Sequence, residues 1–212
     1  MIHNESYRVD LLETLGLQNI TLSENEIAEM FIADLLTEIP ATKLLSAVNN
    51  SSDKAIISEK AVNEPIAEIN AAISATKSVN SKDANANLTA GMVLMNSTKT
   101  ALKQVRDIVG VTSTKYQMVA DNLAKQILQC GINYYNNASD DDVESPRKAM
   151  PLQAYALQIA IGQLTKDRCQ ENYDILKKAV DDMPPAEVAI ETRKVKEERV
   201  LFASNLIKFH IQ

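Results

Sequence analysis

Apolar side chains recur with helical spacing from Thr114 to Pro185, and this periodicity constrains the fold more than any other feature of the sequence. In the first part of the stretch they return at steps of three and four, which places them on one face of a helix with about 3.6 residues per turn. These residues are Tyr116, Val119, Leu123, Ile127, Cys130 and Tyr134. We therefore predict that the stretch forms three consecutive amphipathic helices.

Prolines and small polar residues mark where the second and third of these helices begin and end. Ser145 is suited to be an N-cap, and Pro146 follows at the first helical position, where its missing N–H has no helical partner to lose. Pro151 is an alternative start. The third helix is predicted to begin after Thr165 and to end at the proline pair that starts with Pro184. Its inward side chains are Cys169, Tyr173, Leu176 and Val180.

The same region resembles a tetratricopeptide hairpin over about residues 124–185. From Leu176 to Pro184, a large apolar residue is followed by an alanine, a further apolar residue and a proline at spacings that look like the end of that family's second helix. Ile159 followed by Ala160 is similar to the tight contact of its first helix, and an overlapping register starts at Gly131. The resemblance implies stacked hairpins that bind a segment of another protein in a groove. Generic antiparallel helices with alanine at close contacts explain the same residues.

The composition excludes most β architectures. Five glycines, six prolines, no tryptophan and 4% aromatic residues do not provide the turns and strands of a sandwich or barrel. The chain has 212 residues and 45% hydrophobic content, which is ordinary for a globular protein with its own core. We predict an all-α fold, a bundle of antiparallel helical hairpins with about seven or eight helices, which is tetratricopeptide-like in its C-terminal half if the resemblance holds.

Loop signals suggest a division into an N-terminal helical cap, residues 1–50, and a helical-hairpin body, residues 51–212. The clearest helix start lies in the cap, where Ser23 and Glu26 have the spacing of a capping box. The polar run from Asn49 to Ser52 indicates the loop between cap and body. One continuous domain is the alternative.

Within the body, two long helices precede the organising stretch. Asp53 is predicted to cap the first, and Pro65 is predicted to kink or restart it. Apolar residues from Leu88 to Val109 form a heptad-like seam in the second, interrupted by Lys99 and Arg106. We expect this seam to pack in an antiparallel hairpin.

A closing helix is predicted from about Pro185 to the end of the sequence. Its apolar residues fall at every seventh position, which favours packing along the preceding helices. They are Val188, Val195, Phe202 and Phe209. The same stripe is the candidate interface if copies of the chain self-associate.

Signals for export and membrane insertion are missing from the sequence. Residues 1–16 contain charges and no continuous apolar segment, and no run reaches the roughly 18 apolar residues of a membrane span. Two cysteines do not make a disulfide framework. In an up, down and up arrangement, Cys130 and Cys169 would lie at opposite ends of their helices. We therefore expect reduced thiols, a cytoplasmic location and no membrane partner.

Groups able to carry out chemistry are scarce. The net charge is −6 and the basic residues are dispersed, which argues against a nucleic-acid partner. His3 and His210 are the only histidines, and the five glycines are isolated, so neither a histidine-based metal site nor a phosphate loop is indicated. The acidic loop from Asp140 to Glu144 lacks the calcium-binding pattern of an EF-hand and is expected to be solvated. We expect no enzymatic activity, no cofactor and no metal.

Two polar and aromatic groups remain as candidate partner-binding residues. They are Asn133, Tyr134 and Asn137 at one helix end, and Arg168, Asn172 and Tyr173 near the start of another. Tyrosine and arginine are common at protein interfaces. Regular packing would keep the groups apart as two patches, and internal hydrogen bonds that tie down helix ends are the alternative explanation. The sequence thus predicts a non-enzymatic interaction module, such as an adaptor, scaffold or co-chaperone-like protein, with a self-associating structural subunit as the alternative.

Overall fold

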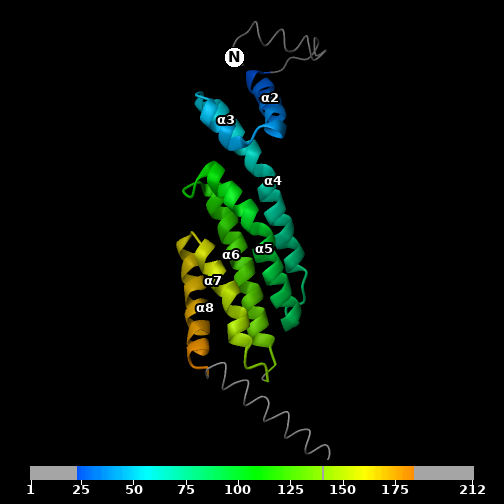
Figure 1. Cartoon of the computed structure of the whole chain (residues 1–212), viewed down its shortest axis with the longest axis vertical. Helices are drawn as coiled ribbons and strands as arrows, with labels where there is room; N and C mark the ends of the chain where they lie inside the picture. Colours follow the sequence, from blue (N-terminus) through cyan, green and yellow to red (C-terminus); the bar gives the residue numbers. More distant parts are fainter. Residues whose placement is uncertain (1–22, 140, 184–212) are drawn as a thin grey trace, which may run out of the picture.

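The computed structural model describes residues 23–139 and 141–183, which form seven α-helices and no strand (Figure 1). The helices are α2 (Glu24–Glu38), α3 (Ala41–Ala47), α4 (Ser51–Lys77), α5 (Ala84–Val109), α6 (Thr114–Asn137), α7 (Ser145–Ile159) and α8 (Gln163–Asp181). The predicted all-α fold is confirmed for these residues. The helix expected before Gly16 and the closing helix expected from Pro185 lie outside the described residues.

Helices α4 to α8 form the body of the molecule. Each one packs against the next, and short loops between them make neighbours antiparallel (Figure 1). Contacts also join alternate helices, α4 to α6, α5 to α7 and α6 to α8. Helix α6 is therefore covered on several sides, whereas α8 is the last helix of the described array.

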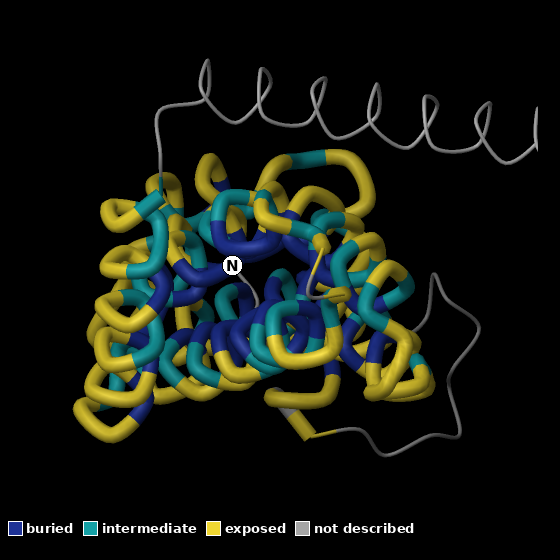
Figure 2. Tube along the Cα trace, turned by 90° about the horizontal axis from the view of Figure 1, so that it is seen from below, coloured by how far each residue is buried: buried dark blue, intermediate teal, exposed yellow. Residues whose placement is uncertain are grey.

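Helix α6 carries the centre of the core. All six residues of its predicted stripe, Tyr116, Val119, Leu123, Ile127, Cys130 and Tyr134, are buried. Ala120, Ala124 and Leu128 on adjacent positions are also buried, because α5 and α7 pack on different sides of the helix. Viewed along the long axis, buried residues face the spaces between helices and exposed residues form the outer surface (Figure 2). Burying each large apolar side chain contributes about 1.5–3 kcal/mol.

Helices α5, α6 and α7 approach one another closely at Gly91. A Cβ atom on Gly91 would lie 2.8 Å from Cβ of Cys130 and 2.8 Å from Cδ1 of Leu152. Only glycine fits at this position without a shift of its neighbours. The absence of one side chain thus sets the spacing of three helices.

Helices α2 and α3 pack against the N-terminal part of α4 and form a small second core. Its buried members are Ile32, Leu44 and Ile57. Helix α4 then continues without a break past Pro65 into the main core, where Val62 and Ile69 are fully buried. The predicted restart at Pro65 is wrong, because the helix accommodates this proline in its interior. Helix α4, which begins at the predicted boundary, therefore contributes to the small core as well as to the main core.

Helix starts follow local capping chemistry, but the predicted starts of α4, α7 and α8 differ from the observed ones. The capping box of Ser23 and Glu26 is confirmed, with hydrogen bonds in both directions. Helix α4 is capped by Asn50 and not by Asp53, because Oδ1 of Asn50 accepts from the backbone N–H groups of Ser52 and Asp53.

The starts of α7 and α8 also differ from the predictions by one or more positions. Ser145 is the first residue of α7, and Glu144 occupies the N-cap position. Helix α8 begins at Gln163 and not after Thr165, because a carboxylate from α6 satisfies the backbone N–H groups that precede it.

Candidate interaction surface

The structure joins the two groups of predicted partner-binding residues through a side chain that the sequence did not single out. Nη2 of Arg168 donates a hydrogen bond of 3.2 Å to Oε1 of Gln129, and Nε2 of Gln129 donates one of 2.8 Å to Oδ1 of Asn133. The expectation of two separate patches is therefore wrong. Helix α8 contacts α6 as well as α7, which brings Arg168 within reach of α6.

The same contact corrects the expected placement of the cysteines. Arg168 and Gln129 are the sequence neighbours of Cys169 and Cys130. The contact between them means that the two cysteines do not lie at opposite ends of the packed helices α6, α7 and α8. Both thiols are free and buried. Burial raises the pKa of the Cys130 thiol to about 11 and also raises the pKa of the Cys169 thiol. Both are therefore poor nucleophiles at neutral pH.

Asn87 continues the hydrogen-bond network into α5 and the loop before it. Its Oδ1 accepts from Nδ2 of Asn133 at 3.0 Å, and its own Nδ2 donates to the backbone oxygens of Asn80 and Asp83. Only 3% of Asn87 is exposed, so these bonds satisfy a buried amide. The sequence offered no signal for this role, because Asn87 stands at the end of a generally polar run.

Asn137 ties the end of α6 to the same loop. Its Nδ2 donates to the backbone oxygens of Ser81, at 3.2 Å, and Asn133, at 2.8 Å. Asn133 and Asn137 thus act within the protein to hold α6 against the α4–α5 loop, as the alternative of internal hydrogen bonding predicts. Asn137 remains exposed and Asn133 is half-buried.

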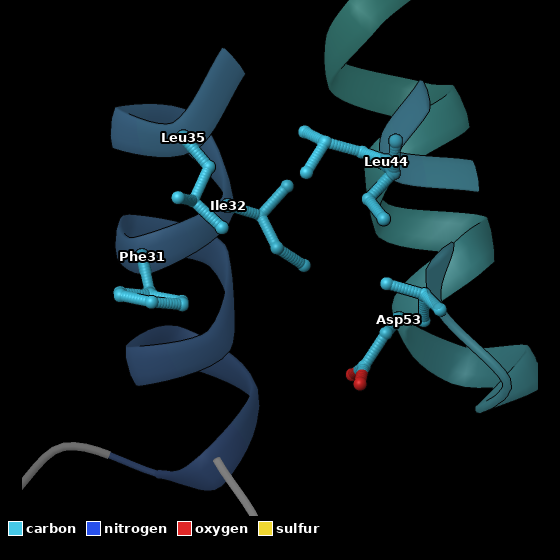
Figure 3. Close-up of a pocket in the computed structure, with 7 residues that line it drawn as sticks. Phe31, Ile32, Leu35, Leu44 and Asp53 are labelled. Carbon is cyan, nitrogen blue, oxygen red and sulfur yellow. The ribbon is translucent and has the colours of Figure 1, made fainter. Parts of the chain in front are cut away.

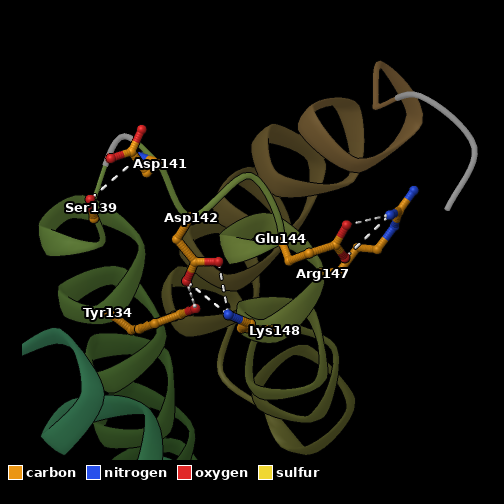
Figure 4. A network of polar contacts seen from close by, with 7 residues as sticks. All are labelled: Tyr134, Ser139, Asp141, Asp142, Glu144, Arg147 and Lys148. Carbon is orange, nitrogen blue, oxygen red and sulfur yellow. Dashed lines mark hydrogen bonds and ion pairs between the residues drawn. The ribbon is translucent and has the colours of Figure 1, made fainter. Parts of the chain in front are cut away.

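Tyr134 is 1% exposed, and its hydroxyl donates a 3.0 Å hydrogen bond to Oδ2 of Asp142 (Figure 4). Nζ of Lys148 donates to Oδ1 of the same carboxylate at 2.8 Å. The hydrogen bond from Lys148, and to a lesser extent that from Tyr134, lowers the pKa of Asp142. Burial, and to a lesser extent the nearby Asp142 carboxylate, raises the pKa of Tyr134 to about 12. Tyr134 therefore links the acidic loop to α6, Lys148 links it to α7, and Asp142 is not simply solvated as predicted.

The remaining predicted residues lie on α8 but not on one face. Arg168 is exposed, whereas Asn172 and Tyr173 are half-buried. Nδ2 of Asn172 donates to the backbone oxygen of Arg168 within the helix. Tyr173 follows Arg168 by five positions, about 140° around the helix, which turns it away from the Arg168 side.

Two exposed apolar residues lie on the same side of α8 as Arg168. Leu164 is 82% exposed and Ile175 is 58% exposed. Their spacings from Arg168, four and seven positions, place them on the same helical face together with Glu171. We call Leu164, Arg168, Glu171 and Ile175 the α8 face. The sequence did not reveal it, because its apolar members fall outside the stripe that packs on the core.

A carboxylate from α6 fixes the start of α8. Asp121 Oδ1 accepts from the backbone N–H of Ile161 at 2.8 Å and from that of Gly162 at 3.1 Å, and Oδ2 accepts from Gly162 at 3.1 Å. Gly162 is the N-cap residue and has no side chain that could perform this role. Asp121 therefore ties the two residues that precede α8 to α6.

A small apolar pocket opens between α2, α3 and α4, at a distance along the chain from the α8 face (Figure 3). Its volume is about 90 Å³. Its lining residues are Phe31, Ile32, Leu35, Leu44, Val48, Asp53 and Ile57. Asp53 is the only charged residue among them, so the pocket lacks the convergent polar groups of a typical small-molecule site.

Within residues 23–139 and 141–183, no three histidine, cysteine, aspartate or glutamate side chains are grouped closely enough to hold a metal ion. None of the helices in these ranges is long and apolar enough to cross a membrane. The chain matches no protein-family model, and no curated protein or solved structure matches it.

Proposed function

We propose that the protein is a non-enzymatic interaction module, an adaptor, scaffold or co-chaperone-like protein, that binds another protein through the α8 face. The observation that carries this proposal is the exposure of Leu164 and Ile175 on the same side of the helix as Arg168. Arginine is among the residues enriched in binding hot spots, and the two exposed apolar side chains beside it would add apolar contact area around it.

The support beneath the α8 face favours the same proposal. Asp121 holds the start of α8, and Gln129 accepts a hydrogen bond from the Arg168 guanidinium. A side chain that is already oriented loses less conformational entropy when a partner binds. Arg168 is therefore suited to recognise a carboxylate or a backbone oxygen of the partner through its remaining N–H donors.

The test is affinity capture of partners by the full chain, with identification by mass spectrometry. Arg168→Ala should weaken capture of a specific partner by about 5- to 30-fold, the effect of losing roughly 1–2 kcal/mol at an interface. Lys166→Ala is the matched control, because Lys166 is an exposed cation on the same helix but on a different face. Equal recovery of every partner by both variants would count against the proposal.

We also propose a cytoplasmic location, which is consistent with two buried free thiols. The alternative function, self-association through Val188, Val195, Phe202 and Phe209, depends on residues outside the described ranges. Light scattering separates the two functions, because a mass that stays monomeric at all concentrations argues against self-association.

A further inference from the structure

We propose that α8 opens from the body as a separate unit while α4 to α7 stay folded. The inference goes beyond the proposed function, because it concerns how α8 is held and not what binds to it. Proteins open locally in cooperative units, and the units with few buried apolar contacts open most often. Opening exposes the inner side of α8 together with the α8 face.

Helix α8 contributes little to the core for its length. Three of its 19 residues, Thr165, Cys169 and Leu176, are buried, whereas ten of the 24 residues of α6 are buried. Leu176 is the only large apolar side chain among the three. Tyr173 and Val180, which were predicted to point inward, are half-buried. Because the hydrophobic effect scales with the apolar area removed from water, α8 is held more weakly than α6.

The hydrogen bonds that join α8 and its preceding loop to α6 lie near the start of the helix. Asp121 accepts from the backbone N–H groups of two loop residues, Ile161 and Gly162. Gln129 accepts from Arg168, which is on the second turn of α8. Among the described residues, no printed side-chain bond joins the later turns of α8 to another helix. We therefore expect the start of α8 to stay attached and the opening to begin at its other end.

The second half of α8 is held by apolar packing. Leu176 packs with Tyr134 of α6 and Ala149 of α7 in a small cluster that is separate from the main core. Helix α8 lies at the edge of the body, beside α7, and Ile175 on the neighbouring position is exposed (Figure 1). This half of the helix can therefore leave the body without disturbing the main core.

A buried polar group on α7 weakens the docking of α8. Gln153 is 3% exposed, and its Oε1 has no hydrogen-bond partner among the described residues. It lies against Gly131 of α6, where an added Cβ would be 2.9 Å from its Nε2. The ring of Tyr155, which contacts Lys99 of α5, is two positions away, about 200° around the helix.

Gln153 therefore points away from α5 and toward α6 and α8, the other helices on which α7 packs. An unpaired oxygen that is buried between helices costs free energy, because it has lost its hydrogen bonds to water. Water reaches this oxygen once α8 has opened, so the cost is present only in the docked state.

The two native cysteines report the opening without any added probe residue. Cys169 is carried by α8, whereas Cys130 lies where α5 and α6 meet, since its Cβ is 2.8 Å from the position of an added Cβ on Gly91. Both thiols are free and buried, so N-ethylmaleimide reacts with each of them only after it becomes exposed. The labelling rate of each thiol in the full chain is measured by mass spectrometry of its peptide, at increasing urea concentrations.

Cys169 should be labelled at least about 100-fold faster than Cys130 in the absence of urea, because opening α8 requires less free energy than unfolding the body. Its rate should also rise less steeply with urea, with no more than about half the slope, because the opening exposes less surface. Equal rates at the two thiols, or equal urea slopes, would overturn the inference.

Two leucine variants separate the opening of α8 from the unfolding of the body. Leu123 follows Asp121 on α6 by two positions, about 200° around the helix, so it faces away from the start of α8 and stays buried when α8 opens. Leu123→Ala should therefore speed the labelling of Cys130 about 100-fold and leave that of Cys169 unchanged.

Leu176→Ala should speed the labelling of both thiols about 100-fold, because Leu176 is buried only while α8 is docked. If α8 opened only when the whole protein unfolds, each leucine variant would speed both thiols to the same extent, and that result would overturn the inference. Full reactivity of Cys169 in Leu176→Ala while Cys130 stays protected would support it, since α8 would then be open in a folded body.

Gln153→Met tests the contribution of the buried amide, because methionine is also unbranched and has no strong hydrogen-bonding group. This variant should slow the labelling of Cys169 about tenfold. Gln158→Met is the matched control, because Gln158 is an exposed glutamine on the same helix. Equal labelling of Cys169 in the two variants would contradict the inference.

Discussion

Replacing Asp121 with alanine should destabilise the protein by about 2 kcal/mol, because the turn that leads into α8 loses its hydrogen bonds to α6. The carboxylate accepts from two backbone N–H groups, those of Ile161 and Gly162. Hydrogen bonds to a charged group contribute roughly 1.5–3 kcal/mol. Asp121 is half-buried, which places the expected cost between these limits.

A substitution at Gly162 tests the contact with Asp121 more directly. Its φ of −65° and ψ of 138° are accessible to any residue, so its backbone does not require glycine. An added Cβ would, however, lie 2.5 Å from Oδ2 of Asp121. Gly162→Ala should therefore cost about 1–3 kcal/mol while Asp121 is present. In the Asp121→Ala background it should be neutral or stabilising by up to about 1 kcal/mol, since alanine has less freedom than glycine in the unfolded chain.

The assay is urea unfolding of the four chains of this double-mutant cycle, followed by circular dichroism. With a slope of about 2 kcal/mol per molar urea, a 2 kcal/mol loss shifts the midpoint by about 1 M. Asp174→Ala is the control, because Asp174 is an exposed aspartate on α8 and its loss should cost less than about 0.5 kcal/mol. Additive effects of the Asp121 and Gly162 substitutions would refute the reasoning, which requires a coupling of about 1 kcal/mol or more.

Three further predictions concern the network, the acidic loop and the core. Asn87→Ala should lower the free energy of unfolding by about 2–3 kcal/mol, because the substitution leaves the buried polar partners of Asn87 unpaired. Urea titration measures this loss, and a cost below about 0.5 kcal/mol would show that those partners form other hydrogen bonds. Because folding lowers the pKa of Asp142, its carboxylate stabilises the folded protein above the ordinary pKa of 3.8, and this stabilisation is lost as the pH falls through the folded pKa. The difference in unfolding free energy between the natural chain and Asp142→Asn should therefore shrink below about pH 4. A pH-independent difference between these two chains would contradict that reasoning. Leu123→Ala should cost about 3 kcal/mol by thermal or urea unfolding, because Leu123 is fully buried in the main core; a near-neutral change would mean that its neighbours refill the space.

The periodicity of apolar residues was sufficient to predict the described helices in outline and the buried face of α6, whereas on α8 the predicted inward residues Tyr173 and Val180 are only half-buried. The stripe on α6 is buried at every predicted position because a helix has one face that must leave water, whatever it packs against. The start of α2 was also predictable, because a capping box involves residues only three positions apart. Interactions of this kind can be predicted from the sequence because they involve residues that are close together in the chain.

The candidate surface could be predicted only in part. Arg168 was identified from its residue type, but its partner Gln129 and the exposed Leu164 and Ile175 were not. Which side of α8 stays open depends on where α6 and α7 lie, and no local pattern contains that information. Tyr134 has the residue type of an interface residue, yet its burial against the α6–α7 connection gives it an internal role.

The sequence by itself determined an all-α chain, the approximate extent of its helices and the identity of most core residues, because these follow from interactions between residues close together in the chain. Tertiary structure alone decided that α8 packs on α6 as well as α7, that Asp121 binds the backbone just before α8, and that one hydrogen-bond network links α5, α6 and α8. These features join residues about 40 or more positions apart. Their geometry depends on how several helices pack at once, and a single helix period does not specify that.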